Sequence, residues 1–221
     1  MISELIDKDN FEKKVRKYNL FSVHSVHLEY LRFFPEEFAS PKEIAMRAVI
    51  LYALAYCSHE PKKRKKVIEW FREEGLWGHI TQGEKSFMKK RFLTRTKKSE
   101  MSWNVESAYV LAWSLGLIHT IQPPTKPLQG KEFEKLVSVL PIIGEPVNKF
   151  LNSQKLRTKS EIFDENLFNE CATSYFRNKL LAGEKYETEI DTNVSFERHN
   201  ALNWVRRMSG VEEWEKTDTS T

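Results

Sequence analysis

A long apolar stretch behind a clear helix start constrains this chain more than any other feature. Ser40-Pro41-Lys42-Glu43 offers a serine N-cap with a proline at the first helical position, and Ile44 to Cys57 follows. This stretch is apolar almost all round, which predicts a central helix packed on several sides. Its longest apolar run, Ala48 to Cys57, is ten residues, against the roughly 20 that cross a bilayer.

Similar start and stop signals recur along the rest of the chain. A helix is expected from Pro61 to Gly75, and the capping-box pattern Thr81-x-x-Glu84 predicts a helix through Leu93. The polar, basic residues 94–101 are expected to form a loop, after which Ser102 would cap a helix that Gly116 closes.

The C-terminal half continues this pattern. Thr158-x-x-Glu161 predicts one or two helical turns, and Asp164 would then cap a new helix that ends at Gly183. A last helix is expected from Phe196 to Met208. Residues 2–18 also indicate a helix, whereas residues 19–34 are compatible with either a helix or a short extended piece.

Composition agrees with a helical chain. The 221 residues include only eight Gly, eight Pro and five Asp, against 26 Glu, which favours helix over turn-rich β structure. We therefore predict an all-α, single multi-helix domain of about eight helices over residues 1–221, with 1–39 as an N-terminal extension and 40–219 as the core.

Nothing in the sequence indicates export or membrane insertion. The N-terminus is charged from its fourth residue and lacks the apolar region of a secretory signal. The two cysteines, Cys57 and Cys171, fall inside apolar helical patterns and are expected to be buried free thiols. We expect a cytoplasmic protein without a membrane partner.

Several ionisable residues fall on the apolar faces of the predicted helices. Arg47 and Glu106 are each surrounded by apolar side chains, Glu197 lies on the apolar side of the last helix, and Arg198 borders its other edge. A charge removed from water costs several kcal/mol unless it is paired and hydrogen-bonded. Arg47 and Glu106 are therefore expected to have partners, each other among the options, and Glu197 to meet an arginine such as Arg157 or Arg198.

These charges have two interpretations. The plainer one is a set of structural ion pairs that hold the helices in register. The other is a carboxylate and arginine cluster that lines a polar pocket.

The order of the motifs resembles the DUF4272 family, a set of mostly bacterial proteins without an assigned activity. The similarity lies in Leu76-Trp77, Ser102-Trp103-x-x-Glu106, Leu156-Arg157, the block 197–204 (Glu-Arg-His-Asn-Ala-Leu-Asn-Trp) and the closing Trp214 with Thr217-Asp218-Thr219. It spans about residues 40 to 219 and supports a single helical domain. The resemblance marks these positions for testing: Trp103, Glu106, Arg157, Glu197, Arg198, Asn203 and Asp218.

The chain departs from the family pattern in the helix after Asp164. The family usually carries an Arg and then a His-Trp pair there, where this chain has Phe168-Asn169-Glu170-Cys171. Any site that the family builds from those positions would be altered here.

One segment is strongly basic. Residues 61–98 carry thirteen Lys or Arg and four Glu, a net charge of +9, whereas residues 184–221 carry nine acids and five bases, a net charge of −4. Clustered cations bind phosphates, and single-strand binders add exposed aromatic rings. A solvated helix face is the plainer interpretation; the candidate nucleic-acid contacts are Lys62, Lys63, Arg64, Lys65, Lys66, Lys89, Lys90 and Arg91.

Other motifs do not form a recognisable catalytic or metal site. Ser114 matches a nucleophile elbow only superficially, because the helical pattern continues through it. His24 and His27 have ligand-like spacing but no clear third ligand, and His199 is expected to be exposed. No metal site is predicted. The sequence also lacks a glycine-rich phosphate loop, and no cofactor is predicted.

Three functions follow from these patterns. The leading one is a non-enzymatic interaction or ligand-binding module with an unknown protein or small-molecule partner. The second is an enzyme with a carboxylate and arginine pocket, using Glu106, Glu197 or Asp218 as acid or base. The third is a nucleic-acid binder that acts through residues 62–98.

Overall fold

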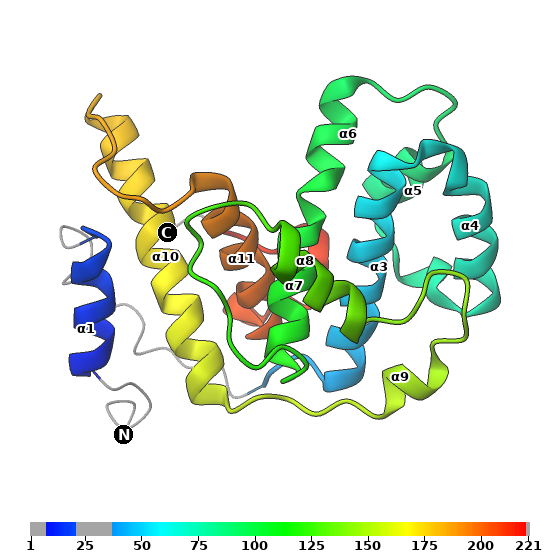
Figure 1. The fold of residues 1–221 in the computed structure, drawn as a ribbon, viewed down its shortest axis with the longest axis horizontal. Coiled ribbons are helices and arrows are strands. Elements are labelled where there is room, and N and C mark those ends of the chain that lie inside the picture. Colours follow the sequence, from blue (N-terminus) through cyan, green and yellow to red (C-terminus); the bar gives the residue numbers. More distant parts are fainter. Residues whose placement is uncertain (1–7, 21–36, 220–221) are drawn as a thin grey trace. The chain divides into compact units, whose positions relative to one another are not determined.

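The structure, a computed structural model, describes residues 8–20 and 37–219 and is helical, with no β-strand in these two ranges (Figure 1). The predicted all-α class is thereby confirmed. The helices in chain order are α1 (Lys8–Lys17), α3 (Pro41–His59), η1 (Pro61–Lys63), α4 (Arg64–Glu73), η2 (Leu76–His79), α5 (Gln82–Lys89), α6 (Arg95–Ser102), α7 (Asn104–Ser114), α8 (Gly130–Val139), α9 (Asn148–Asn152), α10 (Lys159–Leu181), α11 (Thr192–Val205), η3 (Met208–Gly210) and η4 (Trp214–Lys216).

Contacts between Cα atoms group the chain into two compact units. Unit 1 comprises Met1–Phe38, Gln122–Pro127 and Arg157–Thr221, and unit 2 comprises Ala39–Ile121 and Leu128–Leu156. The single domain that the sequence suggests stays a prediction.

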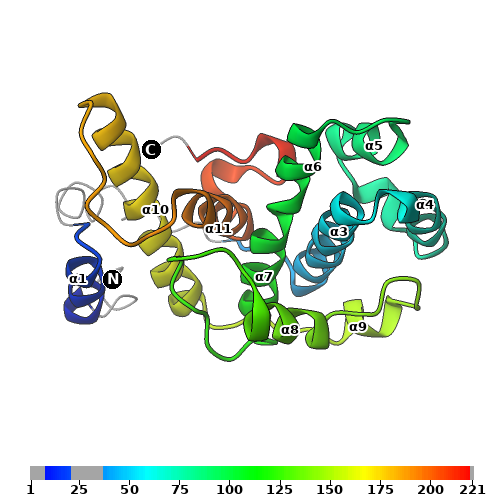
Figure 2. The ribbon, with the colours of Figure 1, turned by 45° about the horizontal axis from the view of Figure 1, so that its top comes forward.

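Unit 2 is built around α3, which packs against α6, α7 and α9 (Figure 2). Its start is the predicted one: the Ser40 hydroxyl accepts a hydrogen bond from the Glu43 amide at 3.3 Å, and the Glu43 carboxylate accepts one from the Ser40 amide at 2.8 Å. Buried side chains occur all round α3, as expected for a central helix.

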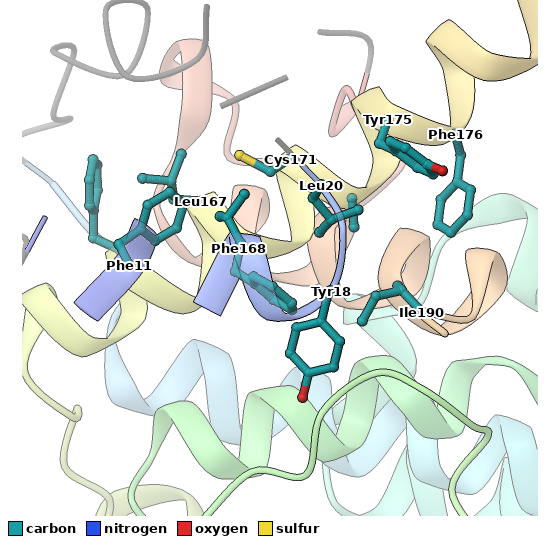
Figure 3. Close-up of a cluster of buried hydrophobic side chains, with 12 residues drawn as sticks. Phe11, Tyr18, Leu20, Leu167, Phe168, Cys171, Tyr175, Phe176 and Ile190 are labelled. Atoms are coloured by element: carbon teal, nitrogen blue, oxygen red, sulfur yellow. The ribbon is translucent and has the colours of Figure 1, made fainter. Parts of the chain in front are cut away.

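Unit 1 is built around α10, with α11 and α1 packed against it. Helix α1 lies in the stretch that the sequence sets apart as an extension, yet it supplies part of the core, shown in Figure 3. The rings of Tyr18 and Phe168 meet edge to face with centroids 5.5 Å apart. The cluster contains Phe11, Val15, Tyr18, Leu20, Phe163, Leu167, Phe168, Cys171, Ala172, Tyr175, Phe176 and Ile190.

Residues 94–101 do not form the expected loop, and Ser102 is not an N-cap. Residues 95–101 form most of α6, and Thr94 caps its start. The Thr94 hydroxyl accepts a hydrogen bond from the Lys97 amide at 3.1 Å. Lys, Arg, Glu and Met are good helix formers even without an apolar stripe, and α6 gains packing against α3. Ser102 is the last residue of α6, and its hydroxyl donates to the Ser99 carbonyl at 2.7 Å.

The break expected at Asp164 is also absent. Helix α10 continues for 23 residues from its Thr158 cap, and the Asp164 and Glu165 carboxylates lie 4.0 and 2.7 Å from the Lys14 ammonium of α1. The close ion pair of Lys14 is therefore with Glu165, and Asp164 lies inside a continuous helix instead of at the start of a new one.

The ends of two other helices differ from their predicted positions. Helix α5 ends at Lys89, before Leu93. Helix α11 begins four residues earlier than expected, because the Asp191 carboxylate accepts hydrogen bonds from the amides of Asn193 and Val194.

Some expectations fall on residues that the structure does not describe. His24 and His27 lie outside the described residues, as do residues 21–34 of the segment left open between helix and strand.

The unit 1 core gives a direct stability prediction. Replacing the fully buried Phe168 with alanine removes its ring contacts with Tyr18 and leaves a cavity. The free energy of unfolding should fall by about 3–5 kcal/mol in chemical denaturation. Phe196→Ala, at a half-exposed ring of the same unit, is the matched control and should cost about 1 kcal/mol or less. Equal small losses for both variants would contradict this packing.

Candidate functional site

A buried ion pair joins α3 to the start of α5 in unit 2. Arg47 is 4% exposed and Glu84 is 6% exposed, and both terminal nitrogens of Arg47 donate to the Glu84 carboxylate. The same carboxylate accepts a hydrogen bond from the Thr81 amide at 2.8 Å, which completes the capping box of α5. Glu84 therefore serves at once as helix cap and as counter-ion, which explains why an arginine is stable inside this unit.

Glu106 has a different kind of partner. It is fully buried in the first turn of α7, and its carboxylate accepts a hydrogen bond from the Leu128 amide. A bond from a backbone N–H to a carboxylate is strong, so it fixes the chain just before α8. Close by on α7, the Tyr109 hydroxyl donates to the Glu132 carboxylate at 3.0 Å.

Polar side chains lie along the buried contact between α10 and α11 in unit 1. Asn166 Nδ2 donates to Asn203 Oδ1 at 2.9 Å, and the Arg206 guanidinium donates to Asn166 Oδ1. Arg206 is fully buried, and its guanidinium carbon lies 4.3 Å from the centroid of the Phe163 ring. We call Asn166, Glu170, Thr173, His199, Asn203 and Arg206 the α10–α11 polar cluster.

His199 lies inside this cluster, so the expectation that it is exposed is wrong. The side chain is fully buried, with Nδ1 2.8 Å from Thr173 Oγ1 and Nε2 3.1 Å from Asn203 Nδ2. The Thr173 hydroxyl donates its one proton to the Glu170 carbonyl at 3.0 Å. The pattern thus assigns a ring proton to Nδ1, which donates to Thr173, while Nε2 accepts from Asn203.

Two charged groups of the polar cluster have shifted pKa values. Burial raises the pKa of Glu170 from its ordinary 4.5 to about 7, an effect that the positive charge of Arg206 partly offsets. Burial also lowers the pKa of Arg206 from 12.5 to about 10, opposed by the charge of Glu170. A carboxylic acid that titrates near neutrality has the pKa of a general acid or base. With Glu170 only 1% exposed, however, the arrangement suits structural specificity better than contact with a substrate.

The C-terminal tail is attached to α10 and α11 by side chains that bind its backbone carbonyls. Asn203 Nδ2 donates to the Asp218 carbonyl at 2.9 Å, and the Trp204 indole donates to the Glu212 carbonyl at 2.9 Å. Arg177 donates to the Thr219 carbonyl at 2.8 Å. Asn203 and Asp218, two of the residues that the family resemblance marks, are therefore brought together through a backbone atom.

The other residues that the family resemblance marks each have their own surroundings. Arg157 pairs with Glu161 at 2.7 Å, and Arg198, fully buried, donates to the Gln122 carbonyl at 2.6 Å. Glu197 is half-buried on α11, and Trp103 is half-buried between α6 and α7. The expected contact of Glu197 with an arginine stays a prediction.

Sequence reasoning missed the carboxylates that matter most. Glu84 is recognisable as a cap but gives no local sign of an ionic partner 37 positions away. Glu170 carries no such sequence signal either: that nearly every side chain of α10 from Ile162 to Phe176 is buried, so that its polar members need partners, is a feature of the structure. The departure at Phe168-Asn169-Glu170-Cys171 coincides with this buried acid.

Arg64 joins the two basic stretches of unit 2. Its guanidinium donates to the carbonyls of Phe87 and Lys90 at 2.7 Å each, and so caps the C-terminal end of α5 from the first turn of α4. This brings the two stretches to one junction. We call its exposed cations the basic junction: Lys62, Lys63, Lys65, Lys66, Lys89, Lys90 and Arg91.

Two aromatic rings accompany the basic junction. Phe92 is 74% exposed, and the Arg91 guanidinium carbon lies 5.1 Å from the centroid of its ring. Trp77 is half-buried, and the Arg72 guanidinium carbon and the Lys89 ammonium nitrogen each lie 5.4 Å from the centroid of its ring. Cations so close to aromatic faces are typical of cation–π contacts.

The described residues offer little for metal or thiol chemistry. Among them, no group of three or more His, Cys, Asp or Glu side chains is arranged to hold a metal ion. Cys57 and Cys171 are free and buried, as predicted, and burial raises the pKa of Cys57 to about 12 and that of Cys171 as well. Protonated thiols are poor nucleophiles and poor metal ligands.

Comparison with known protein families identifies one family for this chain. The profile of DUF4272, a domain of unknown function, matches residues 10–217. The chain belongs to the DUF4272 family. The match begins 30 residues earlier than the resemblance at residue 40 and so takes in α1 from Asn10 onward. No curated protein and no solved structure matches the chain. Within the described residues, no helix combines the length and apolarity that a bilayer crossing requires.

Because Arg47 and Glu84 are paired, removing one charge should lower the free energy of unfolding more than removing both. Arg47→Met leaves the Glu84 carboxylate buried without its counter-ion and should cost about 3–5 kcal/mol of unfolding free energy. Adding Glu84→Gln to Arg47→Met removes the unpaired charge and should restore part of that loss. Denaturant unfolding of the parent, the single variant and the double variant measures both effects. An unfolding free energy of Arg47→Met equal to that of the parent would refute a buried pair.

Glu170 predicts a specific pH dependence of stability. The unfolded chain loses this proton near pH 4.5 and the folded protein near pH 7, so stability should fall as pH rises across this interval. Glu170→Gln should be more stable than the parent at pH 8, and the difference should shrink towards pH 5. Glu161→Gln is the control: a hydrogen bond from Thr158 holds the pKa of the exposed Glu161 below its ordinary value, so its effect lies outside this interval. Parallel stability curves for Glu170→Gln and the parent would contradict the assignment.

Proposed function

We propose that the protein is a non-enzymatic binding module whose partner is a nucleic acid, held by the basic junction of unit 2. The observation that carries this proposal is the Arg64 contact with the end of α5. It makes one region out of two basic stretches that are more than twenty residues apart in the chain. Clustered Lys and Arg provide the sequence-independent part of nucleic-acid affinity by displacing counter-ions from phosphates.

Local acids do little to neutralise this region. Of the four Glu between residues 61 and 98, Glu84 is paired with Arg47, and the Glu74 carboxylate accepts a hydrogen bond from the Val147 amide at 2.8 Å. Only Glu69 and Glu73 are exposed. The basic junction consequently offers an excess of positive charge to an anionic partner.

Arg64 differs in role from the other seven candidate nucleic-acid contacts. Its guanidinium is used by the carbonyls of Pro61, Phe87 and Lys90, so it positions the junction instead of contacting phosphate. The phosphate contacts are therefore assigned to the seven exposed cations.

The enzyme alternative, as the sequence suggests it, uses Glu106 of unit 2 or Glu197 or Asp218 of unit 1 as acid or base, and unit 1 adds a further candidate pair. Its best support is the near-neutral pKa of Glu170 beside Arg206. Both side chains are at most 1% exposed, and so are Glu106 and His199. An acid or base has to reach its substrate, so the exposed basic junction supports a function better than the buried groups do.

Binding to a fluorescent 20-nucleotide oligomer, measured by anisotropy over a range of salt concentrations, tests the proposal. Log affinity should fall linearly with log salt, with a slope of about −0.7 per phosphate contacted in a single strand. Lys65→Gln with Lys89→Gln removes one cation from each stretch and should make the slope shallower by about 1.4. The matched control, Lys126→Gln with Lys131→Gln, removes two exposed lysines elsewhere and should leave the slope unchanged. Undetectable binding at low salt, or equal effects of both pairs, would refute the basic junction as the binding surface.

A further inference from the structure

An exposed phenylalanine directly follows the last cation of the basic junction in the chain. Phe92 belongs to the connection between α5 and α6, directly after Lys90 and Arg91 and shortly before Arg95. Its ring is 74% exposed, the highest value among the exposed aromatic residues of the described chain. Lone apolar side chains on a surface are common, so exposure by itself assigns no role to this ring.

The surroundings of the ring supply the second observation. Arg91 lies over Phe92 with its guanidinium carbon 5.1 Å from the ring centroid. The second ring of this region, Trp77, is likewise flanked by Arg72 and by Lys89 of the junction. Cations beside an accessible ring combine the two contacts that a nucleotide offers, a phosphate charge and a flat base.

We propose that Phe92 is a base-stacking residue and that the partner is single-stranded nucleic acid. This inference rests on the proposed function and adds the strandedness of the partner. In a duplex the faces of the bases are covered by their neighbours, so a surface ring gains nothing from them. An unpaired base can lie on the ring while Lys89, Lys90 and Arg91 meet the phosphates on either side.

The chemistry of the loop favours an unpaired strand over a membrane surface. Binding to a bilayer through an apolar insertion uses a broad apolar face or a second anchor in addition to basic residues. Here the neighbours of Phe92 are Lys90, Arg91 and Thr94, all exposed and polar, with Leu93 half-buried. A single ring with cations around it fits one base better than it fits acyl chains.

Paired measurements on two oligomers test this assignment. Phe92→Ala should weaken binding to a 20-nucleotide oligothymidylate by about 5- to 150-fold, the range for loss of one stacked base. Binding to an abasic oligomer of the same length and charge should be unchanged, because it offers phosphates and no base. Phe92→Trp should retain the affinity for oligothymidylate, and Phe133→Ala, at an exposed ring on α8, is the matched control.

The possible failures are distinguishable. If Phe92→Ala binds both oligomers as the parent does, or loses equal affinity for both, stacking is refuted while lysine-dependent phosphate binding stands. If the parent binds neither oligomer, the proposed function fails together with this inference. If the parent prefers a 20-base-pair duplex, or if Phe92 matters only for vesicles that contain phosphatidylserine, the single-strand assignment is overturned. Equal melting temperatures of Phe92→Ala and the parent exclude loss of fold as the cause.

Discussion

Removing charged groups from water is the constraint around which both compact units are organised. In unit 2 the two terminal nitrogens of Arg47 pair with the Glu84 carboxylate, and the same carboxylate caps α5. In unit 1 the buried Arg206 is supported by Asn166, by the Phe163 ring and by the charge of Glu170. A charge buried in a helical core is stable only where the helices around it are correctly positioned. These contacts therefore fix which helix faces meet, whereas the apolar residues supply most of the driving force.

Under the proposed function, buried charges stabilise the fold and exposed charges bind the partner. Buried groups are held by contacts inside their unit: the ring nitrogens of His199, for example, are engaged by Thr173 of α10 and by Asn203 of its own helix, α11. The cations around Arg64 are exposed instead, and Arg64 itself donates to backbone carbonyls at the end of α5, which joins the two basic stretches. Mutations in the two sets should therefore have different consequences, loss of stability in the first and loss of binding in the second.

Local signals predicted much of the fold. The Ser40, Thr81 and Thr158 caps are where the sequence indicates them, because capping depends on residues three positions apart. Helix α6 was missed since its polar sequence has no apolar stripe, and the break expected at Asp164 is absent because the helix that Thr158 caps continues through that residue. Burial of His199 and the pairing of Arg47 with Glu84 depend on contacts between helices, which helical periodicity does not specify. The basic stretches could be read from the sequence, but their meeting at one junction depends on Arg64 and the end of α5.

The most direct test of this account is hydrogen exchange of the full chain with and without an oligothymidylate, followed by mass spectrometry. A ligand that lies across the basic junction should slow exchange in two separate peptides, one covering residues 61–68 and one covering residues 88–95, and leave α10 and α11 unchanged. Protection confined to unit 1, or no protection in either peptide at a saturating concentration of oligomer, would contradict it.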